Sequence, residues 1–447
     1  MAAPTDRVVA KLQALVRIPT VSDRDPALVD AAAFARLLGE LADQFPRVHA
    51  QLELTRVDTH GLLFRWPGES DDRPIVLMAH LDVVPVDEAA PWQHPPFDAV
   101  IADSPTGAAI WGRGTLDDKG CVVAICEAIE LLLEEGFSPA QDVWLSFGCD
   151  EEVSGTAAVE AVAELRRRGV TPWFVLDEGG AVVSEALPGL KFPLAVIGVA
   201  EKGTTSLELV AEGRGGHAST PAAWGPTARI ARAIVRLEKA SFPASVPEPM
   251  REMLRRIAPR TQVPLRQILA HVDRLDRPVT RVFTALGPEA AAMTRTTLAA
   301  TTLSGSPALN VIASTARAGL NVRIMPGETV AGVVDRVRMF VADKSIRVDV
   351  VDAGEPSPVS PMDEAFELLE ECISEVFPDA VPTPYVMMAA TDSRHFTQIS
   401  ERVYRFAPFR MTKAQRQAIH SYDEHLGIND LIDGVTWYRS LIERLPR

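Results

Sequence analysis

Three apolar segments of the chain are separated by helical patterns, and this alternation restricts the fold most. Residues 74–79 form a continuous apolar run, and 143–147 and 173–176 are also apolar apart from Ser146. Such runs are typical of strands covered on both faces. Helical periodicity appears between them, over 120–135 and 156–168. The sequence therefore predicts an α/β fold in which a mostly parallel central sheet is flanked by helices.

Acidic or histidine residues stand where each of these apolar runs ends. His80 closes the first run, Glu151 and Glu152 follow the second, and Asp177 closes the third. In open α/β sheets, ligands bind beyond the carboxyl ends of the strands. We therefore expect these sequence-distant side chains to meet at one rim of the sheet.

A second domain is expected because 447 residues exceed one typical hydrophobic core. After the third run, the patterns change to a strand-helix-strand-strand-helix-strand order, which is typical of a compact α+β unit. We predict a catalytic domain in two parts, 1–198 and 355–447, with the α+β domain at 199–354. Within the latter, about 243–300 is rich in Pro and Arg, shows no clear strands and is interpreted as an insertion.

The formal net charge of −15 argues against nucleic acid or an anionic membrane as a partner. No window approaches the roughly 18 apolar residues that span a bilayer, and the N-terminal segment lacks a secretory pattern. The four cysteines show no paired or metal-finger spacing. We therefore expect a cytoplasmic protein.

Two adjacent acids, Asp117 and Asp118, stand between a glycine-rich segment and the apolar helix pattern at 120–135. Burying acids at such a position is costly unless a positive group pairs with them. One interpretation is that Asp117 only caps the helix. Capping does not require two acids, however, so the alternative of a metal-ligating carboxylate is favoured.

The candidate ligands and their neighbours combine carboxylates with two imidazoles, without a suitably placed thiolate. The set comprises His80, Asp117, Glu151, Glu152, Asp177 and His420. This mixture of donors suits two Zn²⁺ ions, with Mn²⁺ or Co²⁺ as substitutes. A Glu beside a ligating Glu is a good general base for a metal-bound water. Asp82 lies close enough in sequence to orient the ring of His80, and His425 competes with His420.

Longer motifs around these residues resemble a known family. Residues 78–85 (Met-Ala-His-Leu-Asp-Val-Val-Pro), 112–120 (Gly-Arg-Gly-Thr-Leu-Asp-Asp-Lys-Gly) and 150–152 are similar to the signatures of the dinuclear zinc peptidases and amidohydrolases that include carboxypeptidase G, aminoacylase and carnosinase. Residues 176–180 and 391–395, with the insertion, resemble most the branch of Gly-Xaa carboxypeptidases and N-acyl-amino-acid hydrolases. The resemblance covers nearly the whole chain. It implies a zinc-peptidase-like catalytic domain with an inserted lid and dimerisation domain.

The resemblance also implies a role for each candidate ligand. Asp117 would bridge two metal ions, His80 and Asp177 would complete one site, and Glu152 and His420 would complete the other. Some family members use the Glu after the Asp, so the choice between Asp177 and Glu178 stays open.

Three further features of the catalytic centre follow from the same resemblance. Glu151 would be the general base and later the proton donor, and Asp82 would be the partner of His80. The peptide bond between Asp117 and Asp118 would be cis.

Substrate contacts are expected from both domains. His217 matches a family histidine that stabilises the oxyanion, often in the neighbouring subunit, and Asn310 matches a second substrate-binding donor. Arg323 and Arg394 are candidates to hold a substrate carboxylate, because a guanidinium can form two parallel hydrogen bonds. This chain has Asn321 where family members usually have an Asp.

Together these features predict a dinuclear zinc hydrolase. It would cleave an amide bond next to a free carboxylate in a small molecule, either a dipeptide or an N-acyl amino acid, and the lid predicts a homodimer. Two alternatives remain: an aminoacylase or desuccinylase of different acyl specificity, and a non-catalytic binding protein with the same fold.

Overall fold

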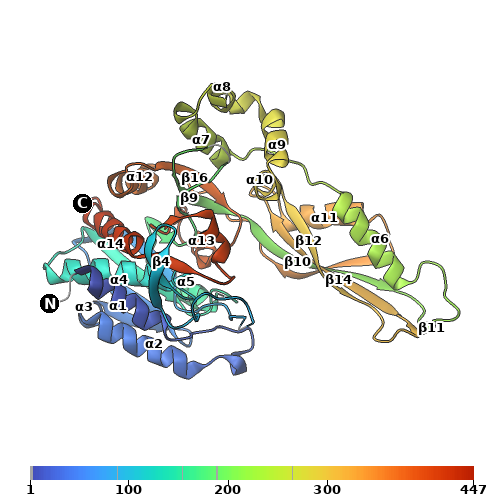
Figure 1. Cartoon of the computed structure of the whole chain (residues 1–447), viewed down its shortest axis with the longest axis horizontal. Helices are drawn as coiled ribbons and strands as arrows, with labels where there is room; N and C mark the ends of the chain where they lie inside the picture. The colour runs from blue at the N-terminus through green and yellow to red at the C-terminus, as the bar shows by residue number, and fades with distance from the viewer. Residues whose placement is uncertain (1–3, 88, 154, 188–189, 264) are drawn as a thin grey trace. The chain divides into compact units, whose positions relative to one another are not determined.

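A computed structural model describes residues 4–447 except 88, 154, 188–189 and 264. The chain forms two compact units (Figure 1). The first runs to Val199 and includes Ser360–Tyr385 and Thr391–Arg447, and the second comprises Ala200–Val359 and Val386–Ala390. The second unit thus extends beyond the predicted 199–354, and it takes a short segment from the predicted second part of the catalytic domain.

In the described part of the chain, the largest sheet has ten strands. Its main path is β1 (Glu53–Val57), β2 (Gly61–Trp66), β6 (Gln141–Gly148), β3 (Ser70–His80), β7 (Phe174–Asp177), β17 (Val403–Arg405), β9 (Leu194–Glu201), β8 (Ala181–Val183) and β18 (Arg410–Met411), and β16 (Val381–Met387) pairs with β9. The neighbours β6, β3, β7 and β17 are parallel to one another. The three predicted apolar strands are β3, β6 and β7, so the predicted α/β class with a mostly parallel central sheet is confirmed.

Helices of the first unit are α1 (Pro4–Val16), α2 (Ala31–Gln44), α3 (Pro46–Gln51), α4 (Lys119–Glu134), α5 (Thr156–Arg167), α12 (Glu364–Val376), α13 (Lys413–Ala418) and α14 (Ile428–Glu443). Helix α4 is buried along most of its length, as its continuous apolar run predicts. It ends before Gly136, whose φ of +73° suits glycine. Across the described residues, no helix has the combination of length and apolar character that crossing a bilayer requires.

A small antiparallel sheet of the first unit joins β4 (Val100–Ser104), β5 (Gly107–Trp111) and β19 (His425–Gly427). Strand β5 leads directly into the segment that carries Asp117, and β19 directly follows the segment that carries His420. Pairing of β5 with β19 therefore brings these two segments together although they are far apart in the sequence.

The second unit has a four-stranded antiparallel sheet in the order β12 (Thr297–Ser304), β14 (Thr315–Ile324), β10 (Gly203–Glu212) and β15 (Ile346–Ala353). Helices α6 (Pro226–Lys239) and α11 (Val330–Val341) supply apolar side chains to its core, including Ile230 and Val337. The chain order β10-α6-β12-β14-α11-β15 is the one that the sequence pattern predicts.

The predicted insertion is mostly helical, with α7 (Glu248–Ile257), α8 (Leu265–Ala270), α9 (Asp276–Ala285) and α10 (Pro288–Ala292). The prediction that it lacks strands up to residue 300 is wrong at its end, because 297–300 belong to β12. The alternation there is weak, since the residues of β12 are half-buried or exposed.

Candidate metal centre

His80, the last residue of β3, is buried and has partners on both ring nitrogens. Its Nδ1 lies 3.0 Å from the backbone oxygen of Asp82 and 3.3 Å from Asp82 Oδ1, and its Nε2 lies 2.9 Å from Asp117 Oδ1. The Asp82 carboxylate also accepts the backbone N–H groups of Glu151 and Glu152, each at 3.2 Å. Asp82 therefore ties the carboxyl end of β3 to the residues that follow β6.

Asp117 contacts two imidazoles rather than capping α4. The N-cap residue of α4 is Asp118, which makes no side-chain capping bond. The two carboxylate oxygens of Asp117 lie 2.9 Å from Nε2 of His80 and 3.0 Å from Nε2 of His420. The Asp117–Asp118 peptide bond is cis, as the resemblance implied. The capping interpretation is thus wrong, and the bridging role of Asp117 stays a prediction that this placement between two imidazoles favours.

His420, not His425, joins the cluster. Its Nε2 lies 3.0 Å from Glu152 Oε2 as well as close to Asp117. His425 is buried in β19, where its ring stacks on Trp111 at a centroid distance of 4.1 Å. The geometry therefore favours His420 over His425, and its role as a ligand stays a prediction.

The geometry favours Glu178 over Asp177 as the third candidate ligand beside His80, and the choice between them stays a prediction. Asp177 Oδ1 accepts the backbone N–H of Glu178 at 3.0 Å, and its Oδ2 accepts the N–H of Ser393 at 2.9 Å. By contrast, the buried Oε2 of Glu178 has no hydrogen-bond partner. Potential ligand atoms of Glu178, His80 and Asp117 all lie within 4.8 Å of one another. Asp177 organises the loop after β7, and Glu178 faces the cluster.

Glu151 lies beside the same cluster, with ligand atoms of Glu151, His80 and Glu152 within 4.8 Å of one another. Burial raises the pKa of Glu151 well above its ordinary value, and the neighbouring carboxylates of Asp392 and Asp117 add to this against the opposing effect of His80. A carboxyl with a raised pKa near the reacting groups can accept and return a proton at neutral pH.

The electrostatics of these side chains fit divalent cations. Hydrogen bonds to Asp117 and then Glu152 raise the pKa of His420 to about 10. Burial opposes protonation of His80, but its contacts with Asp117 and Asp82 raise its pKa well above the usual value. Metal ions can replace such protons as the positive charge among the carboxylates. The two groups His80–Asp117–Glu178 and Asp117–Glu152–His420 share Asp117, which suits a pair of metal ions.

Two of the predicted substrate residues lie together in the second unit. His217 ends the short strand β11 (Gly216–His217), which pairs with β13 (Val311–Ile312). The backbone oxygen of Asn310 accepts the N–H of Ala218 at 3.1 Å. His217 and Asn310 are both exposed, and their roles toward a substrate stay predictions.

The two candidate arginines lie in different units. Arg323 stands near the opposite end of β14 from this pair of strands, and its Nη1 donates to Thr204 Oγ1 at 2.6 Å. Arg394 belongs to the 3₁₀ segment η4 (Asp392–Gln398) of the first unit, and its Nη1 donates to the Thr391 carbonyl at 2.9 Å. Both are half-buried, so surface charge alone does not describe either of them.

Two buried charged residues beside the cluster were missed by the sequence analysis. Arg113 and Glu424 form an ion pair at 2.6 Å, with side chains 2% and 0% exposed. Their only signal in the sequence was their place inside the motif segments that carry Asp117 and His420.

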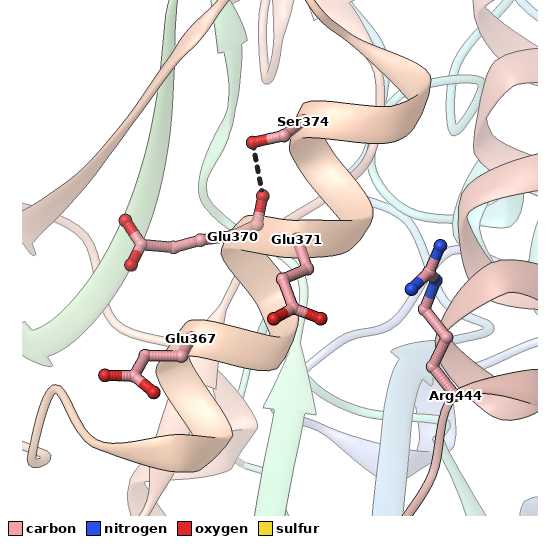
Figure 2. Close-up of a pocket in the computed structure, with 5 residues that line it drawn as sticks. All are labelled: Glu367, Glu370, Glu371, Ser374 and Arg444. Atoms are coloured by element: carbon pink, nitrogen blue, oxygen red, sulfur yellow. Dashed lines mark hydrogen bonds between the residues drawn. The ribbon is translucent and has the colours of Figure 1, made fainter.

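A surface hollow elsewhere in the first unit contains none of the predicted residues. It is lined by Glu367, Glu370, Glu371, Ser374 and Arg444 (Figure 2). Ser374 Oγ donates to the Glu370 carbonyl at 2.8 Å, as is usual for a helical serine. This acidic hollow adds nothing to the chemistry of the cluster.

The α/β unit, with its carboxylates and imidazoles gathered where the parallel strands end, defines a metal-dependent hydrolase. The chain belongs to the peptidase family M20/M25/M40, whose family model matches residues 76–444. The family was therefore correctly identified from the motifs.

Two relatives are similar over most of the chain. N-fatty-acyl-amino acid synthase/hydrolase PM20D1 of Homo sapiens is 34% identical, over 98% of this chain and 88% of its own length. Probable carboxypeptidase S-like 2 of Dictyostelium discoideum is 33% identical, over 90% of this chain and 78% of its own. The M20 family metallo-carboxypeptidase Sso-CP2 of Sulfolobus solfataricus shares the fold, with a TM-score of 0.69 at 17% identity over 98% of each chain.

Proposed function

We propose that this chain uses two zinc ions to hydrolyse the amide bond of an N-acyl amino acid next to the free carboxylate. The observation that carries the proposal is the position of Asp117 between His80 and His420, with Glu151 beside them. A non-catalytic protein of this fold would not need a half-buried glutamate with a raised pKa next to the candidate ligands.

The residues present fit two metal positions that share one carboxylate. His80 and Glu178 would hold one ion, Glu152 and His420 would hold the other, and Asp117 would bridge them. Oxygen and imidazole donors suit Zn²⁺, with Mn²⁺ or Co²⁺ as substitutes. When bound, the metal pair lowers the pKa of water and polarises the substrate carbonyl.

The chain's own side chains then move the protons. Glu151 accepts a proton from the attacking water and delivers it to the leaving nitrogen. Asp82 holds the ring of His80 in one orientation through its contacts with Nδ1. His217 would stabilise the developing oxyanion, Asn310 would be a second donor to the substrate, and Arg394 or Arg323 would bind the substrate carboxylate.

We favour a fatty acyl group as the acyl part of the substrate, because the human relative is named for hydrolysis of N-fatty-acyl amino acids. Cleavage of dipeptides is the second candidate, which the carboxypeptidase S-like relative favours. A desuccinylase or short-chain aminoacylase would use the same centre with a different acyl pocket.

Hydrolysis rates over a panel test the choice. The zinc-loaded protein is assayed with N-oleoyl, N-acetyl and N-succinyl amino acids and with Gly-Xaa dipeptides. We expect the highest kcat/KM for the long acyl chain, and the Glu151→Gln protein serves as the blank. If kcat/KM were highest for the dipeptides, the protein would be assigned as a dipeptide-cleaving carboxypeptidase instead. No turnover of any member would contradict the hydrolase proposal.

We also propose that the protein is a homodimer through its second unit and that it acts in the cytoplasm. The dimer follows from the lid that the family resemblance implies, and light scattering coupled to gel filtration measures it. The location follows from the composition, and fractionation of the source cells tests it.

A further inference from the structure

A carboxylate from the His420 segment holds the backbone that carries Asp117. Glu424 is fully buried, and its Oε1 accepts the backbone N–H groups of Leu116 at 2.8 Å and of Asp117 at 3.2 Å. The backbone oxygen of Glu424 also accepts the N–H of Gly112 at 2.9 Å. The position of Asp117 is thus fixed from a segment more than 300 residues further along the chain.

Arg113 makes the reciprocal contact. Its Nη1 donates to Glu424 Oε2 at 2.6 Å, and its Nη2 donates to the backbone oxygen of Ser421 at 2.5 Å. Ser421 directly follows His420, whose φ is +60°. Non-glycine residues rarely adopt this left-handed conformation unless surrounding contacts enforce it. Arg113 is therefore placed to hold the backbone of His420.

The two contacts form a crossed arrangement. Arg113 precedes Asp117 by four positions, and Glu424 follows His420 by four positions. Each candidate ligand is held by a residue from the other ligand's segment. A buried ion pair allows little displacement, since separating it would leave an uncompensated buried charge. Beyond the pairing of β5 with β19, this ion pair therefore restricts how far the two segments can separate.

We propose that Arg113 and Glu424 are positioning residues that fix Asp117 and His420 at the spacing required by the metal pair. Neither contributes a ligand atom to the metal-capable groups found among the described residues. The proposal rests on the proposed function, because it assumes that Asp117 and His420 bind metal.

A second buried ion pair of the first unit provides a matched control. Lys11 Nζ lies 2.6 Å from Glu127 Oε2, with side chains 7% and 3% exposed. This pair joins α1 to α4, and the side chain of Glu127 is bound by Lys11 and Arg7 rather than by a candidate ligand. A merely structural ion pair would change stability alone, whereas a positioning pair would also change metal binding.

The test uses Glu424→Gln, Arg113→Lys and the control Lys11→Met in the full chain. Zinc dissociation constants are measured by competition with a chelator, and visible spectra are recorded for the Co²⁺-loaded proteins. We expect zinc affinity to fall about 10- to 100-fold in the first two variants. Their Co²⁺ spectra should shift, and kcat should fall more than KM changes. Lys11→Met should keep the wild-type zinc affinity and Co²⁺ spectrum even if its melting temperature falls.

The outcomes separate this inference from the proposed function. Wild-type zinc affinity and Co²⁺ spectrum in a folded Glu424→Gln or Arg113→Lys protein would overturn the positioning role alone, provided that the wild-type protein binds metal and turns over. If the wild-type protein shows no metal-dependent turnover, both proposals fail. If Glu424→Gln does not fold, the result for Arg113→Lys tests the positioning role. This variant keeps the buried positive charge but cannot contact both Glu424 and the Ser421 carbonyl as the guanidinium does.

Discussion

Nε2 of His420 lies 3.0 Å from Oδ2 of Asp117, although one residue precedes α4 and the other precedes α14. The same nitrogen lies 3.0 Å from Glu152. Three distant segments of the first unit therefore converge on one group of atoms. Cations at this point would cross-link those segments, so metal binding, stability and activity should change together.

Replacing Glu151 by Gln should remove activity while leaving the metal in place. The amide keeps the shape of the side chain but cannot accept and return the proton, so kcat should fall roughly 10²- to 10⁴-fold. Steady-state kinetics and metal analysis measure the two properties. A Glu151→Gln protein with its metal and its full rate would refute the role of this residue.

Glu178 and Asp177 should respond differently to substitution. Glu178→Gln should weaken zinc binding at one of two positions, because a neutral amide replaces a carboxylate whose buried Oε2 has no hydrogen-bond partner. Asp177→Asn should mainly lower the melting temperature, since the carboxylate accepts two backbone N–H groups. Calorimetric zinc titrations compare them. Loss of a zinc equivalent in Asp177→Asn alone would restore Asp177 as the ligand.

The metal-free protein should lose stability as the pH rises from neutral. The hydrogen bonds of His420 to Asp117 and Glu152 raise its pKa to about 10, above the ordinary 6.5. The folded state therefore holds a proton that the unfolded state releases, and this contribution is present below pH 6.5 and lost toward pH 10. Urea unfolding in chelator measures it, with His420→Asn as the control. A wild-type minus variant difference that grows with pH would contradict this sign.

Zinc binding should have the opposite pH dependence. A metal ion displaces the proton of His420, so zinc affinity should rise between pH 6 and pH 8 with release of protons. Isothermal titration in buffers of different ionisation enthalpy counts the protons released. If the zinc affinity were constant over this range, metal binding would not displace a proton from His420.

Gly120→Ala should destabilise the protein, although Ala is the better helix former. A Cβ at Gly120, in the first turn of α4, would lie 2.4 Å from the backbone oxygen of Thr115 and would displace the Asp117 loop. At Gly39 in α2 nothing lies within 4 Å of an added Cβ. Gly39→Ala should therefore stabilise by about 0.5–1 kcal/mol, while Gly120→Ala lowers both melting temperature and zinc affinity. Equal effects at the two positions would contradict this account.

Much of the fold could be predicted because apolar periodicity reports burial directly. The buried strands β6 and β7 are mostly apolar in sequence, and α6 begins and ends at the predicted residues 226 and 239. Short strands such as β17 and β18 gave no such signal, because their pairing depends on neighbours distant in sequence. The end of the insertion was misassigned for a related reason, since β12 is partly exposed.

The ligand set was predictable where a motif fixes the chemistry, as at His80 and Asp117. The sequence could not show whether Asp177 or Glu178 is the better candidate ligand. That depends on which of the two carboxylates accepts the backbone N–H of Ser393, and in the structure it is Asp177. It also gave no reason to select Arg113 or Glu424, whose importance lies in contacts with backbone atoms.

The most direct test of the metal pair is anomalous diffraction at the zinc edge from crystals of the zinc-loaded protein. We expect two peaks that share Asp117, one beside His80 and Glu178 and the other beside Glu152 and His420. A single peak, or peaks that lie away from Asp117, would contradict it.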